Sequence, residues 1–172
     1  SSGDGFDVSG SITQQQEIIS GARDAVQADI DYNQTQITAI NERLDRDLEA
    51  LETSLTADIK VQTDKLIPLD SLVSSYSDQE DSGFLNRTDN RGAAVELIAQ
   101  QKPERDAIAL EIQRVTGTAR TREGELRRTA SVAVREAQGN INDYRSQTQS
   151  TVDAATAEIN RLREQSNSSQ DD

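Results

Sequence analysis

The 172-residue chain contains no cysteine, histidine, methionine or tryptophan, and its aromatic residues are three tyrosines and two phenylalanines. Without cysteine and histidine, the usual nucleophile–base pairs and nearly all zinc sites are excluded. The glycine-rich phosphate loop and the nucleophile elbow of hydrolases are also missing. We therefore expect that the protein is not an enzyme and that it has no catalytic residue, no metal site and no cofactor.

Basic residues are few, and lysine is nearly absent. The 31 acidic and 18 basic residues give a net charge of −13, which disfavours nucleic acid and anionic membrane surfaces as partners. No apolar run is long enough for a membrane-spanning helix or a signal peptide, so we expect no membrane insertion. An acidic, lysine-poor chain suits concentrated salt, where its charge repulsion is screened. A halophilic origin is therefore one hypothesis, and an ordinary acidic coiled coil is the alternative.

Large apolar side chains are also scarce, since only 33% of the residues are hydrophobic. Such a chain can fill a thin contact line between helices, called the seam below, but not a broad core. The same composition occurs in disordered chains. The spacing argues against disorder, because apolar residues recur at steps of three and four, as in a coiled coil.

The seam residues are predicted from this spacing alone. Those of the first stretch are Ile37, Ile40, Leu44, Leu48, Leu51, Leu55 and Ile59, and those of the second are Ile108, Ile112, Val115, Leu126, Ile141, Ile159 and Leu162. Ile37, Leu48 and Ile59 recur every eleven residues, a departure from the heptad that locally unwinds a supercoil. Asn33 and Gln62 also fall on the seam, where polar residues cost stability and can fix the register.

Turn and capping signals divide the chain. The pattern Ser11–Gln14 resembles a helix-capping box, Pro68 blocks helix continuation, and Pro103 marks either a kink or a restart. Residues 69–92 show no helical period, and short strand pairing around 72–76 is one alternative there. We expect five segments: a flexible lead over 1–10, a long helix over 11–67, a connector or tip over 68–92, a second long helix over 93–165 and a disordered acidic tail over 166–172.

The similar lengths of the two helices favour an all-α, antiparallel hairpin that assembles further. In that arrangement the leucines of the first helix face the stretch 113–124, whose Gly117, Ala119 and Gly124 offer room for them. The net-acidic stretch 42–58 would also lie beside the net-basic stretch 110–128, and such pairing selects orientation. A parallel homo-oligomer, such as a trimeric fibre, is the alternative.

The sequence contains two further kinds of candidate site, one for a cation and one for glycans. The acidic stretch Asp78–Gly83 loosely resembles a cation-binding loop, although it lacks the spacing of an EF-hand. Asn33, Asn86 and Asn167 begin glycosylation sequons. The seam position of Asn33 argues against a glycan there.

The absence of active-site patterns and the presence of a coiled coil indicate a structural or assembly protein. We expect a component of a virion, tail fibre or extracellular appendage of a salt-adapted system, located in the virion or at the extracellular surface. Its partners would be further copies of itself and other structural proteins of the same assembly. The alternative is a cytoplasmic scaffold or holdase-like chaperone, which would need exposed apolar residues at the tip; Leu72, Val73, Phe84 and Leu85 are the candidates.

Overall fold

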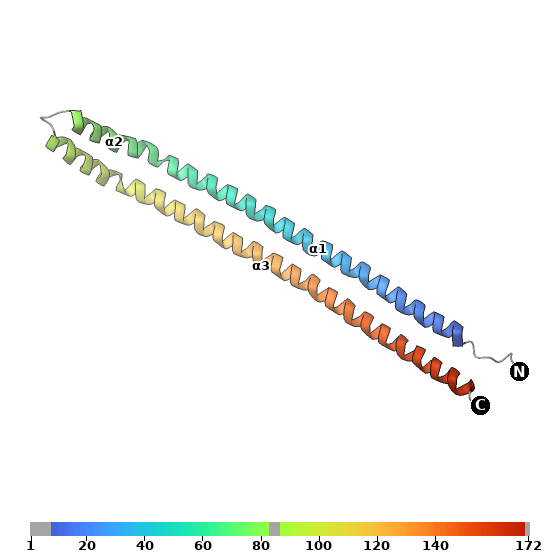
Figure 1. The fold of residues 1–172 in the computed structure, drawn as a ribbon. Helices are drawn as coiled ribbons and strands as arrows, with labels where there is room; N and C mark the ends of the chain where they lie inside the picture. Colours follow the sequence, from blue (N-terminus) through green and yellow to red (C-terminus); the bar gives the residue numbers. More distant parts are fainter. Residues whose placement is uncertain (1–7, 83–86, 171–172) are drawn as a thin grey trace. The chain divides into compact units, whose positions relative to one another are not determined.

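The computed structural model describes residues 8–82 and 87–170, with side chains over 8–76 and 92–168. Over these residues the chain is all-helical: α1 spans Val8–Asp64, α2 spans Leu66–Ser82 and α3 spans Arg87–Gln170 (Figure 1). The described ranges contain no strand. The all-α prediction is therefore confirmed, and two long helices joined with a bend account for it.

The first helix begins earlier than the capping pattern predicts. α1 starts at Val8, so Ser11 lies inside the helix and does not cap it. The Thr13 hydroxyl already donates to the carbonyl of Ser9 at 3.0 Å, four residues back. Val8, Ser11 and Ile12 are half-buried, so packing extends the helix past the local capping signal. The lead expected over 1–10 is helical from residue 8, and the rest of it lies outside the described residues.

Pro68 interrupts the first long helix but does not end it. A proline has no N–H and its ring crowds the carbonyl four residues back, which here is that of Asp64, the last residue of α1. The N–H of Lys65 instead donates to the carbonyl of Gln62 at 3.1 Å, three residues back. Helix α2 then starts at Leu66 and carries Pro68 in its first turn, where no intrahelical donor is required.

The connector expected over 68–92 is wrong for most of its length, because residues 66–82 form α2 and residues from 87 belong to α3. The strand pairing considered for 72–76 is likewise wrong. Leu69, Val73 and Tyr76 are buried or half-buried and lie at positions i, i+4 and i+7, the spacing of one helix face. The helical period therefore continues past Pro68.

The second long helix extends beyond both predicted ends. α3 begins at Arg87, contains Pro103 in its interior and continues to Gln170, so the helix does not restart at the proline and the expected tail is helical over 166–170. Pro103 removes one hydrogen bond, to the carbonyl of Ala99. Gln101, two residues before the proline, is buried, so α3 is packed against its neighbour at this point.

The chain divides into two compact units. Unit 1 joins Ser1–Glu42 to Thr129–Asp172, and unit 2 is Arg43–Arg128. Each unit therefore packs a segment of α1 against a segment of α3 in a hairpin-like, antiparallel pair; unit 2 also contains α2. The candidate site below is described separately for each unit.

Candidate functional site

All fourteen predicted seam residues are shielded from solvent. Ile108, Ile141, Ile159 and Leu162 are buried, and the other ten are half-buried: Ile37, Ile40, Leu44, Leu48, Leu51, Leu55, Ile59, Ile112, Val115 and Leu126. Within each unit these residues are therefore among the less exposed positions of their helices. A role of these residues in assembly remains a prediction.

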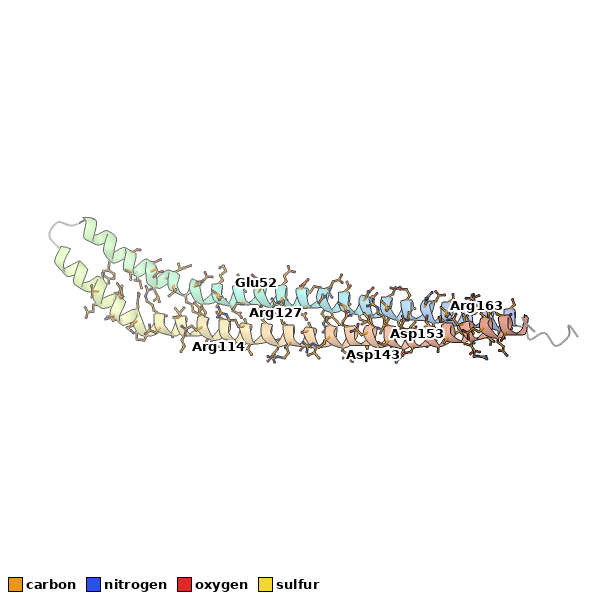
Figure 2. All side chains as sticks on the ribbon, turned by 60° about the horizontal axis from the view of Figure 1, so that its bottom comes forward. Glu52, Arg114, Arg127, Asp143, Asp153 and Arg163 are labelled. Atoms are coloured by element: carbon orange, nitrogen blue, oxygen red, sulfur yellow. The ribbon has the colours of Figure 1, made fainter. Side chains whose placement is uncertain are left out.

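In unit 1 the seam is closed on its α3 side, whereas Ile37 and Ile40 of α1 stay half-buried. Ile141 and Leu162 are each 2% exposed, and Ala155 is 4% exposed. Charged side chains of the same helix segment, such as Asp143, Asp153 and Arg163, are exposed (Figure 2). Alternation of alanine with isoleucine and leucine lets two helices approach closely and fill the space between them.

Asn33 is the buried polar residue of this seam. It is 5% exposed, and its side-chain Nδ2 donates to the carbonyl of Asp29 at 2.8 Å. A buried amide bonded within its own helix avoids the cost of an unpaired polar group. Its burial agrees with the argument that a glycan has no room at Asn33, whereas Asn167 is exposed and Asn86 lies outside the described residues.

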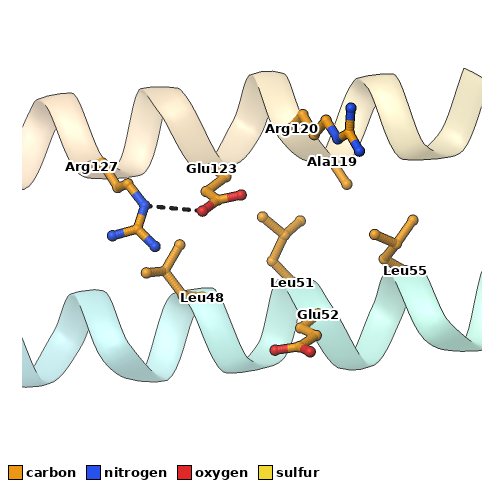
Figure 3. Close-up of a pocket in the computed structure, with 8 residues that line it drawn as sticks. All are labelled: Leu48, Leu51, Glu52, Leu55, Ala119, Arg120, Glu123 and Arg127. Atoms are coloured by element: carbon orange, nitrogen blue, oxygen red, sulfur yellow. Dashed lines mark hydrogen bonds and ion pairs between the residues drawn. The ribbon is translucent and has the colours of Figure 1, made fainter.

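In unit 2 the seam is open at its sides. Leu48, Leu51 and Leu55 of α1 point toward α3 and remain half-buried, while Ala119 of α3 points toward them (Figure 3). Because Ala119 is short, a groove of about 190 Å³ remains beside this contact. Its lining residues are Leu48, Leu51, Glu52, Leu55, Ala119, Arg120, Glu123 and Arg127; we call it the Glu52 groove.

A second groove of about 220 Å³ shares Leu51, Leu55 and Ala119 with the first. Its α1 rim carries Asp58 in place of Glu52. These two acids are six residues apart, which places them about 120° from each other around a helix of 3.6 residues per turn. The two grooves therefore run along opposite flanks of the Leu51–Leu55 contact with Ala119.

The glycines do not supply the room that the sequence predicted. Gly117 and Gly124 are exposed, and a Cβ built on either would have no neighbouring atom within 4 Å outside its own helix turn. Ala119 is buried and does face the leucines. The expected match of large and small side chains thus holds for Ala119 and is wrong for the two glycines.

The predicted pairing of acidic and basic stretches across the helices is also largely wrong. Among the described residues of 42–58 and 110–128, every ion pair lies within one helix at i,i+3 or i,i+4, as for Arg127 with Glu123 at 3.0 Å. Such local pairs need no tertiary contact. Glu52 and Arg120, which both line the Glu52 groove, make no ion pair with any described residue.

One polar cluster does join the two helical segments of unit 2. The Gln101 side chain, 6% exposed, donates from Nε2 to the carbonyl of Leu69 at 3.1 Å and accepts at Oε1 from Arg105 at 3.1 Å. Arg105 also pairs with Asp70 at 2.7 Å. Leu69 and Asp70 directly follow Pro68, and Gln101 and Arg105 lie on either side of Pro103. The two prolines therefore lie at the same level of the two helical segments. Figure 2 shows both helical segments bending in this region.

Several surface pairs shift the pKa of their members. A hydrogen bond from Arg114 at 2.5 Å lowers the pKa of Glu111, and one from Arg161 at 2.6 Å lowers the pKa of Glu158. A hydrogen bond to Asp106 raises the pKa of Lys102. The pairs are solvent-exposed, so each contributes little to stability.

The described residues offer few groups for chemistry. No three carboxylates among them come together as a metal site, and residues 78–82 of the acidic stretch proposed as a cation loop are helical. Their side chains, together with Gly83, Phe84 and Leu85, lie outside the described residues. No described helix is long and apolar enough to cross a bilayer.

Comparisons with family models, with curated proteins and with solved structures found no match for this chain.

Proposed function

We propose that this protein is a structural assembly element: an antiparallel coiled-coil hairpin that associates through its helical flanks, with further copies of itself and with other structural proteins. The observation that carries the proposal is the incompletely covered leucine row. Leu48, Leu51 and Leu55 face α3 and stay half-buried, with a groove on either flank. A pair of helices that buries its apolar row only in part gains stability when another helix covers the rest.

The setting that we propose is a virion, tail fibre or extracellular appendage of a salt-adapted system. Its support is compositional: the net charge of −13 and the absence of cysteine and histidine. If this setting is right, the melting temperature should rise between low and molar salt, because salt screens the repulsion among the carboxylates. A flat or falling melting temperature would contradict the salt-adapted part of the proposal alone.

A scaffold or holdase-like chaperone is the second candidate. The observation in its favour is Leu72 of α2, which is 49% exposed and lies toward the end of unit 2 at which α2 ends and α3 begins. Val73 beside it is half-buried. Holdase activity predicts that Leu72→Ser lowers the suppression of a client's aggregation, whereas the assembly proposal predicts no change.

Spin labels test the hairpin directly, because the chain has no native cysteine. We would label the variant T53C/T121C, whose sites are exposed and lie at about the same level of unit 2. The hairpin predicts a short distance within one chain that persists when labelled protein is diluted with unlabelled protein. A parallel rod predicts an intrachain separation on the order of 100 Å, with no measurable intrachain distance.

The singly labelled variant T53C is the matched control, and the solution mass is recorded on the same samples. A short T53C–T53C distance that disappears on dilution with unlabelled protein, together with a long intrachain distance, would overturn the hairpin in favour of the parallel homo-oligomer. A monomeric mass at all concentrations would remove self-association from the proposal.

A further inference from the structure

The Glu52 groove is lined by an acidic and a basic residue that form no ion pair within the described part of the chain and lie at the same level of the two helices. Glu52 on α1 and Arg120 on α3 line the same groove, both are exposed, and neither forms an ion pair with any described residue. Arg127 of the same groove is held by Glu123 at 3.0 Å. On the other flank Arg114 is held by Glu111 at 2.5 Å, which leaves Asp58 as a rim acid without a free basic counterpart among the described residues there. The Glu52 groove is therefore the flank that keeps an unpaired charge of each sign for pairing with another molecule.

We infer that a second copy of this chain packs on the Glu52 groove, groove against groove, about a two-fold axis parallel to the helices. This inference rests on the proposed assembly function and names its surface. A two-fold axis in that direction keeps every residue at its own level and sets α1 of one copy beside α3 of the other. Glu52 of each copy then lies level with Arg120 of its partner, and two identical ion pairs form.

The same operation covers the apolar row. The flanks of Leu48, Leu51 and Leu55 in one copy meet those of the other, so the half-buried leucines of both copies become the centre of a four-helix arrangement. Every neighbouring helix in it is antiparallel, as in short-looped four-helix bundles. The stretches that contain the groove also differ in net charge: residues 42–58 carry six acidic and two basic residues, and residues 110–128 carry five basic and three acidic residues.

The contact is large enough for a specific dimer. From residue 43 to the end of α1 the flank is roughly 30 Å long, and two helices side by side are roughly 20 Å wide. The flank therefore buries on the order of 600 Å² per copy, or about 1,200 Å² in total, at the lower bound of stable interfaces. The two ion pairs alone would not bury an area of this size, whereas covering the leucine row does.

A charge exchange between two chains tests this contact. We would measure the mass of wild type, E52R, R120E and an equimolar mixture of the two variants by sedimentation equilibrium at about 0.15 M salt, where exposed charges still interact over about 8 Å. Each variant alone sets like charges opposite each other twice, so its dimer dissociation constant should rise tenfold or more. In the mixture, each contact again joins opposite charges, and dimer should return to near the wild-type amount.

The control variants are E49R and R128E, which change the same net charge at exposed residues that do not line the groove. They should dimerise like wild type, and the helical circular dichroism of all four variants should be unchanged. If E52R and R120E dimerise as tightly as wild type, or if the mixture stays dissociated, the groove is not the contact, while the assembly proposal survives. A wild-type protein that is monomeric at every concentration overturns this contact and removes self-association from the proposed function, which then keeps only assembly with other structural proteins.

Discussion

Units 1 and 2 are built from the same long helices, yet they bury their seams to different extents. Seven described residues are buried in unit 1 and four in unit 2. Unit 2 nevertheless has the denser row of leucines, and none of those between residues 44 and 66 is fully buried. A higher content of large apolar residues thus does not by itself produce more burial.

The difference follows from what lies opposite each row. In unit 1, alanines such as Ala137 and Ala155 alternate with Ile141 and Ile159 on one helix, and all four are buried. In unit 2, bulky leucines project from α1 toward Ala119, which is too short to cover their flanks. A two-helix pair buries one line of contact, so the excess apolar surface of unit 2 remains for a further helix.

The largest expected effect is a buried charge in the closed seam. Ile141→Asp places a carboxylate at a site that is 2% exposed and should lower the free energy of unfolding by about 3–5 kcal/mol. Leu51→Asp, at a half-buried site beside two grooves, should cost clearly less, since water reaches the new charge. Urea unfolding followed by circular dichroism measures both. An equal or larger loss for Leu51→Asp would contradict the contrast between the units.

The next effect concerns the polar cluster that joins the helical segments of unit 2. Gln101→Ala removes the bond to the Leu69 carbonyl and the acceptor of Arg105, and we expect a loss of about 1–3 kcal/mol. The control Gln100→Ala changes an exposed neighbour and should be nearly neutral. Thermal unfolding of the two variants measures this difference. Similar melting temperatures would mean that the hydrogen bonds of Gln101 do not stabilise the contact between the two helical segments.

A smaller effect of opposite sign is expected at the outward-facing glycines. Gly117→Ala and Gly124→Ala add a methyl group into open space, so each should raise the free energy of unfolding by about 0.5–1 kcal/mol through helix propensity. Ala119→Gly is the reverse change on the inner face and should destabilise. If either glycine variant lowered the melting temperature, that glycine would face a neighbour that the structure does not show.

The smallest effect depends on pH. Because Arg161 lowers the pKa of Glu158, the pair contributes stability above the ordinary pKa of the carboxyl, and that contribution disappears as the pH falls through the lowered value. Glu158→Gln should therefore reduce the melting temperature slightly at neutral pH and not at strongly acidic pH. The control Glu164→Gln, whose carboxylate has no ion-pair partner among the described residues, should show no such trend. A pH-independent difference for Glu158→Gln would contradict the linkage.

The seam could be predicted because its signal is long and periodic. Over 37–59 and 108–162, steps of three and four leave little choice of inner face. The same signal is present at Leu69, Val73 and Tyr76, but Pro68 hides it. A proline predicts the end of one helix, yet it is also well tolerated in the first turn of a new helix. The ends of α3 were missed because polar residues such as Ser166–Asn167 carry no periodic signal.

The flanks of the seam were harder to predict. Gly117 and Ala119 are two residues apart and thus about 200° apart around a helix, so they cannot both face the leucines; composition alone had grouped them together. Ion pairs were misassigned because an arginine with a glutamate three or four residues away forms a local pair before it reaches another helix. The positions of the grooves depend on the axial register of the two helical segments, which the periodicity of the sequence does not determine.

Pro68 and Pro103 have a mechanical consequence. Pro103 removes one backbone hydrogen bond from α3, and Pro68 lies next to the junction between α1 and α2. Both interruptions fall at one level of unit 2, where the side chains of Gln101 and Arg105 join the two helical segments. We therefore expect unit 2 to bend most easily at this level. The hydrogen bonds and the ion pair of Gln101 and Arg105 hold the two helical segments together there and so limit how far they can move apart.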